Sequence, residues 1–469
     1  MTSTATVPMT RAGRRPVPRW SRDVSVLVAW FGLLAVVVLW LSGGGAQQLA
    51  LGSASALTSS GRLMGLVASY LLLVQVALMA RVPWVERAWG QDGLARAHRL
   101  VGFTSFILML GHIALVVLGY GAAAGTGWLA QAWEMVLTFP GMLLALAGTA
   151  CLVMVSVTSV RIARRRLRYA SWHLLHLYAY LGVGLALPHQ LWTGADFLAS
   201  PIATAYWWGL YGVALAAVLV FRVAAPLRTT FAQRLTVSHI VAESPGVISL
   251  YITGPRLATM AVSAGQFFVW RFRTGAGWTR GHPLSLSAAP NSGSLRITFL
   301  VRGDDGARLA AIKPGTKVMV EGPYGRLIPD VATKRGLVVI GSGLGVTPLI
   351  ALLQDAVSTG KTVDRPATFV RRASSADNQP LQADVDRLLA SGGVKVLDLV
   401  GPRSRAGTPW LPQHLGHVPG PKALKLLVPD LDDCDVYLCG TGPWMDAVTA
   451  DLRAAGVPDT ALHIERFDW

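Results

Sequence analysis

The first 222 residues contain six long apolar stretches separated by short polar ones. The stretches lie near 24–42, 63–80, 100–120, 135–160, 169–192 and 202–221, and none of them contains Asp, Glu, Lys or Arg. A helix needs roughly 18–25 such residues to cross a bilayer. The pattern therefore predicts a six-helix, all-α transmembrane bundle over residues 24–222, preceded by a basic N-terminal segment at 1–23.

The pattern changes near residue 229, where the chain takes on the composition of a soluble protein. Short stretches such as RLTVSHIV, GQFFVWRFR and SLRITFLVR alternate apolar and polar residues between Gly and Pro. This alternation predicts a small antiparallel β-barrel domain over residues 229–328. At 336–357, GLVVIGSGLGVTPLIALLQDAV predicts a strand, a glycine turn and a helix, within an α/β nucleotide-binding domain over residues 333–469. The expected fold is thus multi-domain.

Arginines gather before the first apolar stretch and around the second and fourth loops. They are Arg11, Arg14, Arg15, Arg19, Arg22, Arg81, Arg87, Arg96, Arg99, Arg161, Arg164, Arg165, Arg166 and Arg168. The other loops hold little charge beyond Arg62, Glu134 and Asp196. Because cytoplasmic loops carry the excess of Lys and Arg, we expect a multi-pass cell-membrane protein whose N-terminus and C-terminal domains are cytoplasmic.

Because the arginines lie in these loops, the net charge of +17 indicates how the chain is oriented in the membrane. We therefore expect the lipid bilayer as a partner and no nucleic acid, while an accessory membrane subunit is not predictable. The first stretch exceeds the apolar core of about 7–15 residues usual in signal peptides, so a retained helix is expected. The three cysteines, Cys151, Cys434 and Cys439, form no C-x-x-C pair, which argues against a disulfide, an iron–sulfur cluster or a cysteine zinc site.

Five of the ten histidines lie in or beside the third and fifth apolar stretches: His98, His112, His173, His176 and His189. An ionisable side chain in a bilayer is costly and normally faces the bundle interior, where it has a function. His98 and His112 are 14 residues apart, close to four helical turns, so both rings emerge on nearly one face of a helix. Two haems stacked across a bilayer need this spacing.

The fifth stretch offers His176 and His189 as the partner pair. Their separation of 13 residues rotates an ideal helix by about 220°, which places the rings on different faces unless a kink at Pro188 re-aims His189. Taking His173 instead gives about 160°, which is no better. Spacing alone leaves His173 and His176 open. Because the third and fifth stretches run in the same direction, the four imidazoles predict two bis-histidine pockets at two depths.

The arginine-rich loop, Trp172-x-x-x-His176 and the second histidine 13 residues on resemble the ferric reductase and NADPH oxidase family, whose six-helix domain holds two b-type haems. The resemblance implies His176 as the ligand and His173 as its neighbour. The inner haem would then be held by His98 and His176, and the outer haem by His112 and His189. Imidazole on both sides of an iron suits electron transfer better than ligand binding.

GHPLSLSAAP at 281–290, followed by EGPYG at 321–325, resembles the FAD-binding motif of the same family and of ferredoxin-reductase-like proteins. The resemblance implies that His282 lies near the FAD diphosphate, Leu284 lies against the isoalloxazine ring, and Ser285 bonds near its reactive nitrogen. Pro283 is expected in the same FAD site. A second contact is expected at Gly303 and Gly306, where backbone N–H groups open a helix. The threonine of the family's G-D-x-T turn is missing there.

The glycine turn after the first α/β strand is similar to the dinucleotide site of the same reductases. Gly341, Gly343 and Gly345 let the backbone approach a pyrophosphate, and Thr347 and Pro348 complete the pattern at the start of the helix. After the next strand, Arg371, Arg372 and Ser374 are expected at the adenosine ribose. Arginines suit a 2′-phosphate, so NADPH is favoured and NADH is the alternative.

DVYLCGTGPWMDAV resembles the family's C-G-P motif. It implies that Cys439 lies beside the nicotinamide, with Gly440 and Pro443 in the same site. The final residue, Trp469, matches a terminal aromatic residue that covers the flavin ring by stacking. Cys439, Trp469 and Ser285 are therefore the expected catalytic residues.

These features imply a flavohaem transmembrane oxidoreductase that moves electrons from cytoplasmic NAD(P)H through FAD and two b-type haems to an extracytoplasmic one-electron acceptor. Oxidases of the family carry a further histidine one turn after the outer ligand, and Val116 stands there. This favours a ferric chelate over oxygen as the acceptor. The alternatives are superoxide production, electron transfer to a membrane partner protein or quinone, and a haem-bearing redox sensor with negligible turnover.

Overall fold

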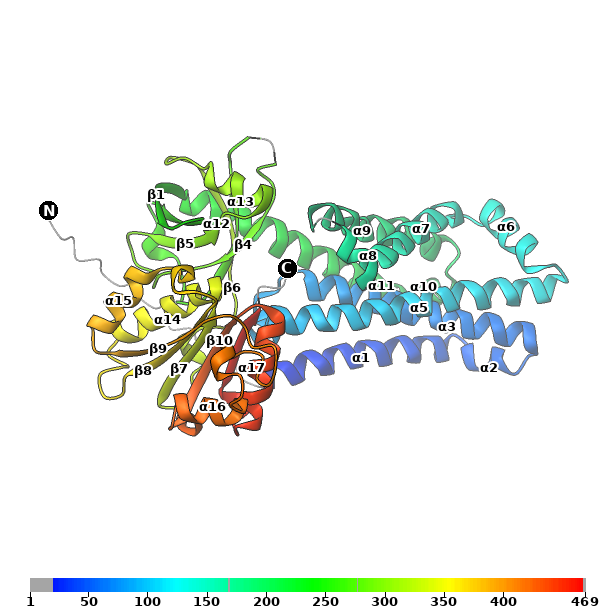
Figure 1. Ribbon diagram of the computed structural model, residues 1–469. Helices are drawn as coiled ribbons and strands as arrows, with labels where there is room; N and C mark the ends of the chain where they lie inside the picture. The colour runs from blue at the N-terminus through cyan, green and yellow to red at the C-terminus, as the bar shows by residue number, and fades with distance from the viewer. Residues whose placement is uncertain (1–19, 168, 276, 467–469) are drawn as a thin grey trace. The chain divides into compact units, whose positions relative to one another are not determined.

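The computed structural model describes residues 20–167, 169–275 and 277–466 of the protein (Figure 1). Its internal contacts divide the described chain into two compact units, with the division between Val223 and Ala224. The first unit is helical, and the second contains all the described strands. We call them the helical unit and the reductase unit.

Six long helices form most of the helical unit. They are α1 (Trp20–Ser42), α3 (Ser53–Met79), α5 (Gln91–Ala124), α7 (Met142–Ser159), α9 (Tyr169–Trp192) and α11 (Pro201–Ala217). Shorter helices lie between them: α2 (Gly45–Leu49), α4 (Pro83–Trp89), α6 (Trp128–Thr138), α8 (Arg161–Arg166) and α10 (Ala195–Leu198). The predicted stretch at 135–160 is thus divided between α6 and α7, and Gly141 takes a left-handed φ of +81° at the break.

Only five helices of the described residues are both long and apolar enough to span a bilayer, so the prediction of six was wrong. They are Trp20–Ser42, Ser53–Met79, Gly93–Ala124, Met142–Ser159 and Pro201–Gln233. The expected fifth span, α9, is a helix of 24 residues that contains three histidines and Gln190, and it is not among these five. The last span also runs past 222, through the π-helical turn η1 (Val218–Ala224) into α12 (Ala225–Gln233).

Glycines bring the long helices together in pairs. α3 packs on α5 along Gly61 and Gly65, where added Cβ atoms would lie 2.9 Å from Val116 Cγ2 and 2.5 Å from His112 Nδ1. α7 and α9 cross at Gly148 and Gly182, and a Cβ on Gly148 would lie 2.7 Å from the Gly182 carbonyl oxygen. Small residues at such crossings let membrane helices approach closely, because lipid provides no hydrophobic drive between them.

The reductase unit begins with two three-stranded antiparallel sheets rather than one continuous sheet. One has the order β1 (Thr236–Ser244), β2 (Val247–Thr253), β5 (Leu295–Leu300), and the other β4 (His282–Ser285), β3 (Phe267–Phe272), β6 (Val318–Tyr324). Side chains from both sheets, including Leu250, Phe268, Trp270 and Ile297, form one buried core. Two isolated bridges, Thr236 to Lys317 and Leu286 to Ile297, connect the sheets. A closed barrel is not confirmed.

A five-stranded parallel sheet follows, with the order β11 (Leu462–Arg466), β10 (Cys434–Gly440), β7 (Gly336–Ser342), β8 (Ala367–Ala373), β9 (Val394–Val400). Its strands are apolar because helices cover both faces. α14 (Val346–Ser358) and α15 (Gln382–Ala390) share a core with one face, and α16 (Gly420–Leu427) and α17 (Gly442–Ala454) with the other (Figure 1). The chain leaves β7 first toward β8 and later returns to β10, so the sheet has a topological switch point where ligands bind.

Asp435, at the start of β10, ties the segment before β7 to the parallel sheet. Its Oδ2 accepts from the backbone N–H groups of Thr333 and Lys334, and its Oδ1 lies 2.8 Å from Nε2 of His463 on β11. Burial acts to raise the pKa of Asp435, but these bonds outweigh it and hold the pKa below the usual 3.8. The carboxylate therefore stabilises the fold above that value, and this contribution is lost as the pH falls through the lower folded-state pKa.

Asp435→Asn is expected to lower the free energy of unfolding near neutral pH by roughly 1–3 kcal/mol, because it removes the charge of an acceptor that four donors share. It is also expected to flatten the decline of stability below about pH 4. Thermal unfolding midpoints of the detergent-purified protein across the acid range check both effects. Asp459→Asn is the control, because that carboxylate is 72% exposed and should change neither. A wild-type acid profile in Asp435→Asn would contradict the assignment.

Candidate functional site

The five histidines of the helical unit lie on two helices: His98 and His112 on α5, and His173, His176 and His189 on α9. Four of them, His98, His112, His176 and His189, are the predicted ligands. The ring centroids of His98 and His176 are 5.9 Å apart. Two imidazoles that bind one iron from opposite sides have their centroids about 6 Å apart, since each nitrogen lies about 2 Å from the metal. The separation of these two rings therefore fits an iron between them.

Each of the four histidines has a partner for its Nδ1 atom. Nδ1 lies 3.3 Å from the Gln75 carbonyl oxygen in His98 and 2.8 Å from the Gly61 carbonyl oxygen in His112, and in His189 it bonds to the Ala186 carbonyl. A carbonyl oxygen only accepts, so Nδ1 carries the proton and Nε2 keeps its lone pair. Metal-binding histidines are oriented in this way by a second hydrogen bond.

His176 differs from the other three in its surroundings. Its Nδ1 lies 3.2 Å from Oγ of Ser159, and its ring lies 4.9 Å from that of Trp172. His173 is exposed, whereas His176 is partly buried and faces His98. The structure thus places the ring of His176 beside that of His98, as the resemblance implies for the ligand.

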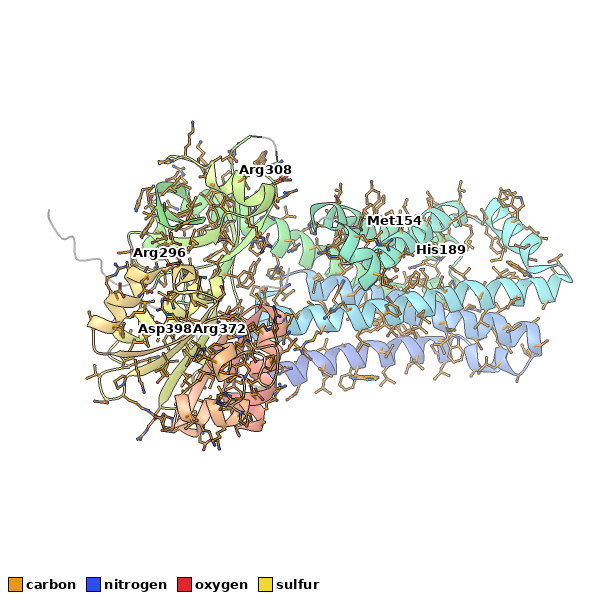
Figure 2. All side chains as sticks on the ribbon, viewed as in Figure 1. Met154, His189, Arg296, Arg308, Arg372 and Asp398 are labelled. Carbon is orange, nitrogen blue, oxygen red and sulfur yellow. The ribbon has the colours of Figure 1, made fainter. Side chains whose placement is uncertain are left out.

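His189, labelled in Figure 2, follows Pro188 in an unbroken α9 that continues to Trp192. Gly141 packs directly on it, since an added Cβ would lie 2.8 Å from the His189 backbone nitrogen. On α3, Gly65 makes room for the ring of His112 in the same way. Glycines thus border both histidines of the expected outer pocket.

The predicted flavin strand is β4, which pairs with β3 so that Ser285 lies opposite Phe267 and His282 opposite Trp270. Oγ of Ser285 is buried and has no hydrogen-bond partner within the part of the chain that the structure describes. A buried hydroxyl without a partner is costly, so its presence fits a ligand that completes the bond. FAD, which accepts hydrogen bonds on its ring, fits this position.

Positive charge surrounds the other end of β4. Burial lowers the pKa of His282, and the charges of Asp305, Arg280, Arg271 and Arg308 act on it as well. Arg280 also pairs with Asp305 in the first turn of α13 (Gly303–Ala310). At Gly303, φ is +63° and no heavy atom of the described chain lies within 4 Å of where a Cβ would be, while Gly306 is packed against Val301. These features fit a diphosphate.

Ser285→Ala is expected to stabilise the FAD-free protein and to weaken FAD binding. The substitution removes an unsatisfied buried oxygen, worth about 1–3 kcal/mol of unfolding free energy, and deletes a hydrogen bond worth roughly tenfold in the FAD dissociation constant. Thermal unfolding without FAD and fluorescence titration with FAD measure the two effects. Ser287→Ala is the control with the opposite sign, because its hydroxyl already accepts from Arg296 and Thr298. A lower unfolding midpoint in FAD-free Ser285→Ala would contradict the assignment.

The glycine turn lies at the switch point of the parallel sheet. Gly341 lies opposite Cys439 of β10 and Arg371 of β8. A Cβ on Gly345 would lie 2.4 Å from the Cys439 carbonyl oxygen, so only glycine lets the turn rest on β10. Gly343 has a φ of +55°, and no heavy atom of the described residues lies within 4 Å of where a Cβ would be. This open space beside the turn suits a phosphate.

Behind this turn, the first residues of α14 are packed into the core. Thr347 donates from Oγ1 to the Leu344 carbonyl at 2.9 Å, and Pro348 is buried. Both residues therefore shape the turn and do not face its open side.

Cys439 and Gly440 are buried at the carboxyl end of β10, whereas Pro443 of the C-G-P segment is exposed. Cys439 lies opposite Glu465 of β11, and Gly440 packs against the ring of Trp444. Pro443 occupies the first turn of α17. The predicted lid, Trp469, lies outside the described residues.

Glu465 is a residue that the sequence analysis missed. Its Oε1 would lie 2.8 Å from a Cβ on Gly325, in the EGPYG turn. Tyr324 in that turn lies opposite Phe267, which in turn lies opposite Ser285. β11 therefore brings Cys439 and the flavin strand into one neighbourhood. The signal available in the sequence was an acidic residue in the short segment LHIER, two residues before FDW.

Arg371 and Arg372 line a pocket with the glycine turn, and Ser374 follows at the end of β8. The lining residues are Gly343, Val346, Arg371, Arg372, Ala373, Gln379 and Pro380. The guanidinium of Arg371 is already engaged by both oxygens of Asp398, at 2.7 and 2.8 Å, and by Gln379 and Gln382. Asp398 on β9 was another residue missed, since nothing in the sequence links it to Arg371.

Arg372 has no acidic partner among the described residues. Within the described part of the chain, its hydrogen bonds go to the carbonyls of Trp410, Ala373 and Leu399. Burial, and then the charge of Arg403, lower the pKa of its guanidinium. A buried cation without a counter-ion fits an anionic ligand group, which makes Arg372 rather than Arg371 the residue suited to a 2′-phosphate.

Comparisons with known proteins agree with this organisation. Residues 64–187 match the family model of the ferric reductase like transmembrane component, a range that contains His98, His112 and His176 and ends just before His189. The ferredoxin reductase component of the 3-ketosteroid-9-alpha-monooxygenase of Mycolicibacterium smegmatis is 27% identical over 243 residues, covering 50% of this chain and 65% of the relative.

Two further relatives carry haem or oxidase names. A flavohemoprotein of Bacillus subtilis is 27% identical over 209 residues, covering 44% of this chain and 51% of the relative. Respiratory burst oxidase homolog protein D of Arabidopsis thaliana is 27% identical over 164 residues, covering 30% of this chain and 18% of the relative. The chain thus spans less than two thirds of each relative's length. It joins a ferric-reductase-type transmembrane component to a ferredoxin-reductase-type FAD and NAD module, and is homologous to respiratory burst oxidases and flavohaemoprotein-type reductases.

Proposed function

We propose that the protein moves electrons from cytoplasmic NAD(P)H through FAD and two b-type haems to a one-electron acceptor outside the cell. The observation that carries this proposal is the pair of rings on α5 and α9, His98 and His176, held 5.9 Å apart with Nδ1 of each partnered. FAD and haem, when bound, supply the passage from hydride to single-electron chemistry. The chain's part is to bind, orient and insulate them.

In the helical unit, His98 and His176 are proposed to hold the inner haem and His112 and His189 the outer one. The Nδ1 contacts would orient each ring and leave its Nε2 available to bind a metal. The arginine-rich loops support the cytoplasmic placement of the inner pair by the positive-inside rule.

In the reductase unit, Ser285 is proposed to hydrogen-bond the flavin and His282 with its neighbouring arginines to hold the diphosphate. Gly343 leaves space for the dinucleotide phosphates, and Arg372 binds the 2′-phosphate of NADPH. Cys439 is proposed to align the nicotinamide, and Trp469 to cover the flavin until the nicotinamide arrives.

A ferric chelate is the favoured acceptor, because Val116 stands where oxidases of the resembling family carry a further histidine. Val116 packs against Gly61, so this place holds an apolar helix contact instead of a polar oxygen pocket. One observation favours oxygen instead, namely the relative named as a respiratory burst oxidase homologue. The two acceptors differ in product, so one experiment separates them.

The test adds NADPH anaerobically to the purified holoprotein and follows the flavin and haem absorption bands. The proposal expects the flavin to be reduced first and both haems afterwards. Ferric chelate or oxygen is then added, and rapid haem reoxidation with ferrous iron or with superoxide identifies the acceptor. Haem bands that stay oxidised while the flavin is reduced would overturn the proposal. Slow reoxidation by both acceptors would favour a membrane partner or quinone.

A further inference from the structure

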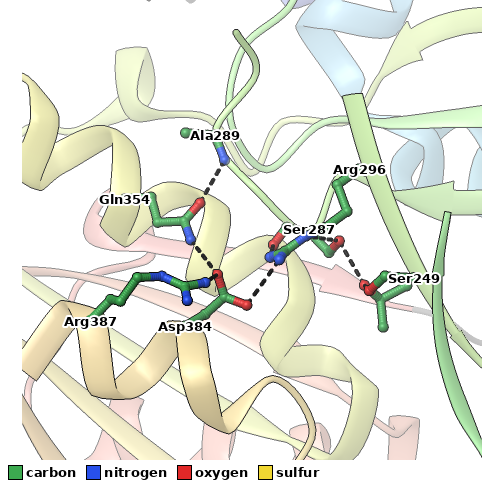
Figure 3. A network of polar contacts seen from close by, with 8 residues as sticks. Ser249, Ser287, Ala289, Arg296, Gln354, Asp384 and Arg387 are labelled. Atoms are coloured by element: carbon green, nitrogen blue, oxygen red, sulfur yellow. Dashed lines mark hydrogen bonds and ion pairs between the residues drawn. The ribbon is translucent and has the colours of Figure 1, made fainter. Parts of the chain in front are cut away.

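A buried polar network joins the antiparallel sheets of the reductase unit to its parallel-sheet part (Figure 3). At its centre, Nη1 of Arg296 on β5 lies 2.9 Å from Oδ2 of Asp384 on α15. The two side chains are only 5% and 3% exposed. Buried charges persist only when geometry and further hydrogen bonds compensate their desolvation, so the partners of this pair matter.

The arginine holds the segment directly after the flavin strand. Nε of Arg296 donates to Oγ of Ser287 at 3.1 Å, and Nη2 donates to the Ser287 carbonyl. Thr298, two residues further along β5, donates to the same Oγ at 2.7 Å and bonds to Ser249 on β2. Ser287 is two residues beyond Ser285, so these bonds fix the backbone next to the proposed flavin contact.

The aspartate holds the helix that follows the glycine turn. Oδ1 of Asp384 accepts from Nε2 of Gln354 on α14 at 2.9 Å. Oε1 of Gln354 accepts from the backbone N–H of Ala289, also at 2.9 Å. α14 is thereby connected to the segment at 287–289 twice, once directly through Gln354 and once through Asp384 and Arg296.

Stability alone does not account for an ion pair at this place. Buried ion pairs are often replaced by apolar residues of similar volume without loss of stability. Apolar side chains, however, make no directional bonds that select one arrangement of two elements. Bonds to an ionised partner are shorter and stronger than neutral ones, and they constrain both distance and angle.

We propose that Arg296, Asp384 and Gln354 are positioning residues that set the flavin strand β4 relative to the nucleotide-binding helix α14. The inference rests on the proposed function, because the step served is hydride transfer from nicotinamide to flavin. In that transfer a C–H bond of the reduced nicotinamide breaks, and the hydrogen with both electrons passes to the oxidised flavin. The nicotinamide is left as the oxidised cation. A misplacement of about 1 Å costs on the order of 100-fold in such a step.

The test uses the full-length holoprotein and three variants. Asp384→Asn removes the charge, and the double variant Arg296→Met with Asp384→Leu replaces the pair by apolar residues of similar volume. Arg387→Ala is the matched control. Arg387 also donates to Oδ1 of Asp384, at 2.7 Å, but it lies on the same helix and is 66% exposed, so its removal leaves the connection intact.

The rate of flavin reduction by saturating NADPH is measured by anaerobic rapid mixing. It is expected to fall on the order of 10- to 100-fold in Asp384→Asn and in the double variant. The KM for NADPH is expected to stay within about twofold, because the loss falls on the transition state. The charge-transfer absorbance of stacked nicotinamide and flavin should weaken in the same two variants, and hydrogen exchange at the Ala289 amide should quicken. In both variants, the FAD content and the reduction by dithionite should match the wild type. Arg387→Ala should match the wild type in every measurement.

Reduction at the wild-type rate in the double variant would overturn the inference, and this holds even where Asp384→Asn does not fold. Equal slowing in Arg387→Ala would overturn it too. Loss of FAD or of folding from the double variant would make the network a stability element and would likewise end the proposal. A wild-type protein whose flavin is reduced by neither NADPH nor NADH refutes the proposed function itself, which distinguishes the two failures.

Discussion

Replacing His98 or His176 with alanine is expected to halve the haem content, from two b-type haems per chain to one. Each substitution removes one of two axial nitrogens, so the remaining imidazole no longer makes a low-spin, six-coordinate iron. Electron flow to an outside acceptor should fall to background, because the inner position connects the flavin to the outer one. Haem-to-protein ratio, measured as the pyridine haemochrome, and the low-spin signal in electron paramagnetic resonance check this result.

His173→Ala is the matched control, since His173 lies on the same helix one turn away and is exposed. It is expected to keep both haems and their low-spin spectrum. Loss of a haem from His173→Ala, with retention of both in His176→Ala, would reverse the ligand assignment. Retention of both haems in His98→Ala would remove the basis of the proposed function.

Arg372→Gln is expected to lower the preference for NADPH over NADH on the order of 10- to 100-fold. The substitution removes a charge-assisted bond to the 2′-phosphate, worth about 1.5–3 kcal/mol, while its amide can still donate to the neighbouring carbonyls. The kcat/KM for NADPH should fall, and that for NADH should stay near the wild-type value. Steady-state reduction of a ferric chelate with each coenzyme measures the ratio.

Arg371→Gln is the control for this prediction. Its guanidinium donates hydrogen bonds to Asp398, Gln379 and Gln382. Its loss should therefore lower the stability of the protein and reduce kcat/KM for both coenzymes alike. A selective loss of NADPH in Arg371→Gln, with none in Arg372→Gln, would show that the phosphate displaces Asp398.

The helices and the glycine turn followed from the sequence because local composition determines them. An apolar stretch has few alternatives in a bilayer, and Gly345 lies where any side chain would meet the Cys439 carbonyl. The same argument overestimated the number of apolar spans. In α9 the histidines that indicated a haem site also reduced the apolar character by which a span is recognised.

The pairings between side chains far apart in the sequence could not be predicted from the sequence. Arg296 and Asp384 are 88 positions apart, and Arg371 and Asp398 are 27 apart. Nothing local distinguishes these residues from solvent-exposed charges, because partner choice depends on which strands and helices become neighbours. The antiparallel sheets show the same limit, since alternation identifies strands but does not determine whether they close into a barrel.

The contact of Gly148 with Gly182 has a consequence for how the protein responds to its lipid surroundings. Because the backbones of α7 and α9 lie this close at their crossing, the two helices are expected to tilt together when the hydrocarbon layer becomes thinner or thicker. His176 and His189 both lie on α9, so the distance between them along the helix is expected to stay the same in membranes of different thickness.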